Sequence, residues 1–94
     1  MFRPIALEEA IEAKAWYRAQ AGLGDVFADD LEHALDLVIE YPGIGLTVSS
    51  RGARRVLLRR FPYALFYVIR RDALVVLAVF HVSRDPKRLR GRLK

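Results

Sequence analysis

Hydrophobic residues recur at helical spacing near the start of the chain. In residues 5–20 the apolar positions are Leu7, Ala10, Ile11 and Tyr17. Three acidic side chains are expected on the other, solvent-facing side: Glu8, Glu9 and Glu12. Pro4 suits a first helical turn, and the glutamates suit the positive end of the helix dipole. The pattern predicts an amphipathic helix over residues 5–20.

A second helical pattern covers residues 25–41. Its apolar stripe consists of Phe27, Leu31, Leu35 and Val38, with Ala34 as a small neighbour. Its acidic residues are expected to face solvent: Asp29, Asp30, Glu32, Asp36 and Glu40. Asp25 is the predicted N-cap, because a carboxylate accepts free N–H groups of the first turn, and Pro42 with Gly43 ends the helix. The short link at residues 21–24 predicts an antiparallel helical hairpin.

The pattern changes to strands between residues 54 and 86. Residues 63–69 and 74–82 are rich in Val, Ile, Phe and Tyr, and they follow a shorter run that begins at Arg54. The gaps between these runs are too short for a parallel return, so the neighbours must be antiparallel. Residues 43–53 are the longest irregular segment. The prediction is one α+β domain over residues 1–94, with the hairpin covering one face of a three- to four-stranded antiparallel sheet.

Charge is distributed unevenly along the chain. Residues 1–50 hold three basic and nine acidic side chains, whereas residues 51–94 hold thirteen basic and two acidic ones. The overall net charge of +5 therefore combines a balance of −6 with one of +11. Such a field attracts a polyanion or an acidic polypeptide, although a merely solvated basic surface is the alternative.

Several classes of function lack sequence support. The chain has no cysteine, which excludes disulfides and cysteine-based zinc sites. The glycines of residues 43–53 match no phosphate-cradling motif, so they predict a turn and no nucleotide site. We expect no cofactor and no metal. No apolar run is long enough to span a bilayer, and the first residues are not typical of a signal peptide, so we expect a cytoplasmic protein.

Two histidines are available for chemistry. His33 is expected to face solvent on the second helix. His81 ends a strand, and Arg84 and Asp85 follow it. A histidine that exchanges protons near neutral pH, beside an arginine that stabilises phosphate charge, is the minimum set for cutting RNA through its 2′-hydroxyl. The alternatives are a strand-end histidine hydrogen-bonded to backbone or to Asp85, and an Arg84–Asp85 ion pair at the corner of the sheet.

Arginines and aromatic residues surround the first predicted strand of the sheet. The arginines are Arg54, Arg55, Arg59 and Arg60, and their forked side chains suit phosphates and carboxylates. The nearby aromatic residues are Phe61, Tyr63, Phe66, Tyr67 and Phe80. Base stacking is one interpretation of these rings, and packing in the core of a small sheet is the more common one.

Short segments along nearly the whole chain resemble the ParE/RelE superfamily of bacterial type II toxins, and its ParE (plasmid-stabilisation) branch most. The segments are Ala-Leu-Glu-Glu-Ala at 6–10, Trp16-Tyr17, Gly-Leu-Gly-Asp-Val-Phe at 22–27, Tyr-Pro-Gly-Ile-Gly at 41–45, Arg-Arg-Phe-Pro-Tyr-Ala-Leu-Phe-Tyr at 59–67 and Val-Phe-His-Val-Ser-Arg-Asp-Pro at 79–86. The last two are the distinctive ones. The resemblance implies a helical hairpin on an antiparallel sheet and an antitoxin whose C-terminal segment wraps the toxin.

The superfamily divides by target. ParE-type members poison DNA gyrase, whereas RelE-type members cut messenger RNA on the ribosome with basic residues. Two basic positions of the RelE type are occupied by arginine here, at Arg55 and Arg84. Two others are occupied by the uncharged residues Leu57 and Ala64, and the position of a later RelE-type tyrosine falls near Arg90. Members of the family usually begin with a full edge strand before the first helix. Only residues 2–5 could form such a strand here, so either the strand is abbreviated or the start assigned to the chain is late.

Three hypotheses follow. The first is inhibition of gyrase by protein contact, using the basic sheet edge and the tail at residues 84–94. The second is a ribosome-dependent endoribonuclease with His81 and Arg84 as acid–base and phosphate-stabilising groups and Arg55 among the residues that hold RNA. The third is a relic that binds only its antitoxin. We expect the toxin to form a hetero-oligomer with an antitoxin that contributes an acidic amphipathic segment. We expect this complex to bind DNA only through the antitoxin. Residues expected to contact antitoxin or target are Arg54, Arg55, Arg59, Arg60, Arg84, Asp85, Arg88 and Arg90.

Overall fold

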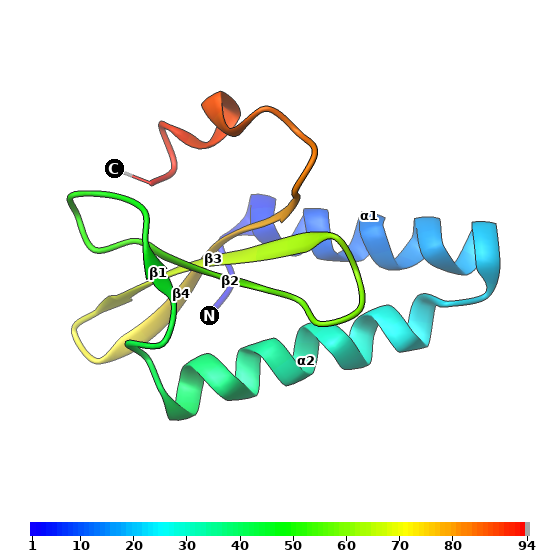
Figure 1. The fold of residues 1–94 in the computed structure, drawn as a ribbon, viewed down its shortest axis with the longest axis horizontal. Helices are drawn as coiled ribbons and strands as arrows, with labels where there is room; N and C mark the ends of the chain where they lie inside the picture. The colour runs from blue at the N-terminus through cyan, green and yellow to red at the C-terminus, as the bar shows by residue number, and fades with distance from the viewer. Residues whose placement is uncertain (94) are drawn as a thin grey trace.

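The computed structural model describes residues 1–93, and in it two helices precede a four-stranded antiparallel sheet (Figure 1). The helices are α1 (Pro4–Ala21) and α2 (Gly24–Glu40). The strands are β1 (Leu46–Thr47), β2 (Arg54–Leu57), β3 (Tyr63–Arg70) and β4 (Ala73–His81), in the order β1-β2-β3-β4. A short 3₁₀ helix, η1 (Pro86–Leu89), follows. The predicted α+β fold and hairpin are confirmed.

Helix α1 packs through small side chains. Its buried residues are Ala6, Ala10 and Ala13. Leu7 and Ile11, which were expected in the buried stripe, are 48% and 58% exposed, so that part of the prediction is wrong. The alanines let α1 lie close to β4 and α2, and Tyr17 near the end of the helix adds one large side chain to that contact. The helix ends at Gly22, whose φ of 67° lies in the left-handed region that favours glycine.

The N-cap of helix α2 lies two residues earlier than predicted. Leu23 is at the N-cap without a side-chain hydrogen bond, and Asp25 lies inside the first turn, so the prediction of Asp25 as N-cap is wrong. The two helices approach closely at this boundary, where a Cβ atom on Gly24 would lie 2.9 Å from the Cβ atom of Arg18. His33 is exposed on α2, as predicted.

The two faces of the sheet are covered differently. The helices cover one face, where the first core cluster includes Phe27, Val38, Leu65, Tyr67 and Val76. The chain after β4 crosses the other face (Figure 1), where Leu89 is 1% exposed in a second cluster. The basic tail is therefore part of the packed fold.

The edges of the sheet also differ from expectation. The segment predicted to be irregular contains β1, which pairs with β2. At the other edge, Phe2 forms a single parallel bridge with Val76, and Val76 N–H donates to the Met1 carbonyl at 2.7 Å. Pro4 has no N–H and begins α1, so the abbreviated edge strand goes no further. No helix within residues 1–93 is long and apolar enough to cross a membrane.

Two carboxylates expected to face solvent lie inside the fold. Asp30 is 3% exposed and accepts the backbone N–H groups of residues 59, 60 and 61, the shortest being Arg60 N–H at 2.8 Å. Glu9 accepts the N–H of Val79 at 3.1 Å and pairs with Arg92 at 2.8 Å and 3.0 Å. Each carboxylate accepts backbone N–H groups where no neighbouring strand pairs with them, and Glu9 also neutralises the charge of Arg92.

Candidate functional site

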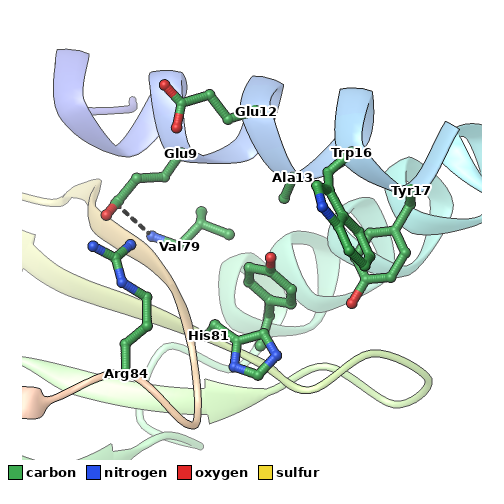
Figure 2. Close-up of a pocket in the computed structure, with 9 residues that line it drawn as sticks. Glu9, Glu12, Ala13, Trp16, Tyr17, Val79, His81 and Arg84 are labelled. Carbon is green, nitrogen blue, oxygen red and sulfur yellow. Dashed lines mark hydrogen bonds between the residues drawn. The ribbon is translucent and has the colours of Figure 1, made fainter. Parts of the chain in front are cut away.

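A pocket of about 320 Å³ lies between α1 and the C-terminal end of β4. Helix α1 contributes five of its residues, which are Glu9, Glu12, Ala13, Trp16 and Tyr17. The sheet contributes Tyr63, Val79 and His81, and Arg84 follows β4. Figure 2 shows Trp16 and Tyr17 at one end of this pocket and Arg84, beside Glu9, at the other. The structure thus brings His81 and Arg84 together.

His81 is held by the turn that follows it. Its Nδ1 accepts the Ser83 N–H at 3.0 Å and lies 2.7 Å from Ser83 Oγ. A ring whose Nδ1 accepts a backbone N–H carries its proton on Nε2 when neutral, which leaves Nε2–H as the donor. His81 packs edge-on against Tyr63 with ring centroids 5.1 Å apart. Of the two partners considered from sequence, the backbone is the one observed.

Arg84 and Asp85 do not pair with each other within residues 1–93. Asp85 accepts the Lys87 N–H at 2.9 Å and so caps η1. The guanidinium of Arg84 lies over the ring of Phe80, 4.5 Å from its centroid. The ion pair considered from sequence is therefore not formed. Asp85 instead caps η1, and Arg84 makes a cation–π contact.

The two tyrosines of the pocket are protonated at neutral pH. Burial raises the pKa of the Tyr17 phenol. Burial also raises the pKa of Tyr63, the neighbouring Tyr17 raises it further, and the positive charge of Arg84 lowers it. At neutral pH their hydroxyls are therefore uncharged groups that can donate and accept hydrogen bonds. Most of the other aromatic rings are core, as Phe61 shows by its 4.6 Å edge contact with Tyr17.

Arg54 and Arg55 make different contacts. Arg54 donates to the carbonyls of Gly45 at 2.7 Å and Gly43 at 3.2 Å, so it supports the loop before β1. Arg55 pairs with Phe66 and lies on the face of the second core cluster, two strands from β4. His81 pairs with Tyr63, on the helix-covered face. Arg55 and His81 therefore lie on opposite faces, and Arg55 is absent from the pocket that His81 and Arg84 line.

The remaining predicted arginines lie on the surface. Arg59 and Arg60 occupy the β2–β3 turn, where Asp30 fixes the backbone and leaves both side chains exposed. Arg88 and Arg90 are exposed on either side of the buried Leu89. None of these four forms an ion pair within the described chain, so their charges are available to a partner.

Sequence reasoning missed the contribution of α1 to the pocket. Glu9 lies three residues after the buried Ala6, and Asp30 lies three residues after the buried Phe27, so helical spacing places each on the buried face. That signal was present in the sequence and was overridden by the usual exposure of carboxylates. Residues 1–93 hold no group of three or more His, Cys, Asp or Glu side chains suited to a metal ion.

The fold is similar to a solved toxin–antitoxin structure. A chain described as the chromosomal ParDE TA system from P. aeruginosa matches with a TM-score of 0.75 and 15% sequence identity. The match covers 87% of this chain and 92% of that chain. At this identity the similarity establishes the fold. A comparison with curated proteins finds no significant match.

The family follows from the sequence itself. A family model described as ParE toxin of type II toxin-antitoxin system, parDE, matches residues 1–86. The chain belongs to this ParE toxin family, which confirms the resemblance noted in its sequence. Membership implies an antitoxin partner.

Proposed function

We propose that this toxin inhibits DNA gyrase by protein–protein contact and is neutralised by a cognate antitoxin. The observation that carries the proposal is that Arg55 lies on the opposite face of the sheet from His81 and outside its pocket, so the residues expected of a nuclease do not form one catalytic centre. A contact inhibitor needs no such centre. It needs accessible charge, and the exposed arginines of the β2–β3 turn and the tail supply it.

A plasmid assay tests this proposal. Purified toxin is incubated with supercoiled plasmid, gyrase and ATP, and DNA cleavage is read on a gel. The expected result is linear plasmid that accumulates with toxin and is absent when gyrase is omitted. Plasmid that stays intact at high toxin concentration would contradict the proposal.

The role of the tail is tested by neutralising its exposed charges and not by truncating the chain. Removal of residues after Asp85 would also remove Leu89 and Arg92, which pack against the sheet and α1. A triple variant with Lys87, Arg88 and Arg90 changed to Gln keeps both anchors. Gyrase poisoning should fall while stability changes by only about 0.5 kcal/mol, as is usual at exposed positions. Undiminished poisoning by a folded triple variant would remove the tail from the contact surface.

Antitoxin binding is proposed on the face of the sheet around Arg55. Leu46 pairs with Arg55, and Leu57 lies on the same face, so two exposed apolar side chains flank one cation. An amphipathic segment with carboxylates beside apolar residues is complementary to that arrangement. Arg59 and Arg60 extend the positive surface at the adjoining turn, whereas Arg54 is committed to loop carbonyls.

A ribonuclease is the second candidate, because His81, Arg84 and two tyrosines line the same pocket. The variant His81→Ala separates the two activities. Growth arrest that disappears in a stably produced variant would favour RNA cleavage, whereas retained arrest and retained gyrase poisoning would exclude a catalytic histidine.

A further inference from the structure

The pocket at the end of β4 has an aromatic end and a cationic end. Trp16 is 57% exposed at the aromatic end, where its ring is available for stacking although Tyr17 beside it is largely part of the core. Arg84 lies at the opposite end (Figure 2), and His81 also lines the pocket. Ala13 and Val79 form apolar lining between the two ends. The pocket therefore fits a ligand that is flat and apolar at one end and anionic at the other.

The guanidinium of Arg84 at the cationic end forms no ion pair within the described chain. Glu9 is the acidic neighbour of Arg84, but Arg92 already pairs with both of its carboxylate oxygens. Arg92 and Arg84 both lie over the ring of Phe80, at 5.9 Å and 4.5 Å from its centroid. Within residues 1–93 Arg84 has no ion-pair partner, so its guanidinium is available to an anion, although Glu12 places a second carboxylate in the pocket lining.

The pocket also contains one hydrogen-bond donor that has no partner within the described chain. Ser83 occupies Nδ1 of His81, which leaves Nε2–H without a partner in the described chain. Glu12 is an exposed carboxylate that projects from α1 on the side of Glu9, away from Trp16 (Figure 2). A single unstacked nucleotide has each of the complementary groups, namely a stacking face, polar base edges and a phosphate.

We propose that this pocket binds one nucleotide, with its base stacked on Trp16 and its phosphate on Arg84. The site uses side chains from α1 and from the end of β4, and it contains no glycine-rich loop, so no phosphate-binding motif marks it in the sequence. The proposal goes beyond gyrase inhibition, since it requires neither gyrase nor bond cleavage. A gyrase assay and a binding assay therefore fail independently.

Trp16 is the only tryptophan in the chain, so its fluorescence reports directly on the pocket. The full chain is titrated with AMP, GMP, CMP and UMP, and separately with adenosine and with inorganic phosphate. At least one nucleotide should change the emission saturably with a millimolar or lower Kd. Adenosine and phosphate should each bind about tenfold more weakly or not at all, because each lacks one of the two contacts.

Two variants and a control locate the ligand. Arg84→Ala should weaken nucleotide binding about tenfold, the usual effect of removing one charge-assisted contact. Trp16→Ala should weaken it by a similar factor in calorimetry, where no fluorophore is needed. Arg88→Ala, which removes an exposed arginine outside the pocket, should bind as the unmodified chain does.

Three results would overturn the proposal. The first is no saturable change up to about 10 mM of any nucleotide, a concentration beyond weak specific binding. The second is equal affinity for adenosine and AMP, which would leave Arg84 without a role. The third is equal loss of affinity in Arg84→Ala and Arg88→Ala, which would show nonspecific attraction to a basic protein.

Discussion

Asp30 shows how one buried carboxylate organises the turn between β2 and β3. It accepts three backbone N–H groups from residues 59–61, and those groups would otherwise lie at the end of β2 without partners. The turn that carries Arg59 and Arg60 is therefore attached to α2. Its arginines are presented from a fixed backbone, which reduces the ordering cost of binding.

Replacement of Asp30 by Asn should lower the free energy of unfolding by about 1–3 kcal/mol, because the amide nitrogen cannot accept an N–H and leaves a buried donor unsatisfied. Urea denaturation measures the change. Asp29→Asn is the matched control, since the same change is made at an exposed neighbour and should have little effect. Equal stability of the two variants would contradict the role given to Asp30.

Tyr17 makes stability depend on pH at the alkaline end. Its phenol pKa in the folded state is raised by burial above the ordinary value of 10.0. Between these two pKa values the unfolded chain has lost the proton that the folded chain retains, so the unfolding free energy falls as the pH rises above about 10. The stabilising effect is fully present below that pH.

Tyr17→Phe should make this alkaline loss of stability shallower, because the titrating phenol is removed while the ring that contacts Phe27 and Phe61 is kept. Denaturation at a series of pH values from neutral to alkaline measures the slope. Tyr41→Phe, at an exposed ring, controls for loss of a phenol. An unchanged slope in Tyr17→Phe would show that other groups account for the dependence.

At the scale of elements, η1 acts as a cover for the second face of the sheet. Leu89 packs in the cluster that contains Ala64, Phe66, Ala78 and Phe80. Leu89→Ala should lower the unfolding free energy by about 2–3 kcal/mol, near the lower end for buried leucines because a terminal segment can relax into the space. Leu57→Ala, at a leucine that is 58% exposed on the same face, is the control and should change stability little.

The pair Glu9–Arg92 joins the first helix to the tail. Both side chains are mostly buried, and the contact is bidentate. A double-mutant cycle with Glu9→Gln and Arg92→Gln should give a coupling energy of about 1–2 kcal/mol, between the values for exposed pairs and for fully buried ones. The exposed pair Lys14–Asp25, 3.9 Å apart, is the control and should show no measurable coupling. Equal coupling in the two cycles would contradict a special role for the Arg92 contact.

At the scale of the whole molecule, charge is divided between the layers of the fold. The acidic residues concentrate in the two helices, and the basic residues concentrate in the sheet, its turns and the tail. A partner that approaches the basic side meets an attractive field, and one that approaches the exposed face of the helices meets a repulsive one. The division therefore favours a single orientation for an acidic antitoxin.

This division predicts that association with an acidic antitoxin segment slows and weakens as salt is added, since screening shortens the range of the attraction. Stopped-flow or surface-binding kinetics between low and physiological ionic strength measure the slope. The double variant Arg59→Gln with Arg60→Gln should reduce the slope, and Arg18→Gln, on α1, should not. An affinity independent of ionic strength would contradict the electrostatic account.

The sequence by itself determined the class of fold, the helical hairpin and the antiparallel order of the long strands. These features depend on local periodicity and on gaps too short for any other connection, so no knowledge of distant contacts was needed. The distinctive segments at residues 59–67 and 79–86 also predicted the family that the family model identifies.

Only the tertiary structure decided which side chains of a helix are buried and which residues share a pocket. The helix packing selected Ala6, Ala10 and Ala13 over the larger Leu7 and Ile11, because close approach requires small side chains. The sheet register set Arg55 apart from His81, and α1 brought Trp16 to the end of β4. These contacts join residues far apart in the chain, and their geometry is fixed by packing, which local sequence patterns do not encode.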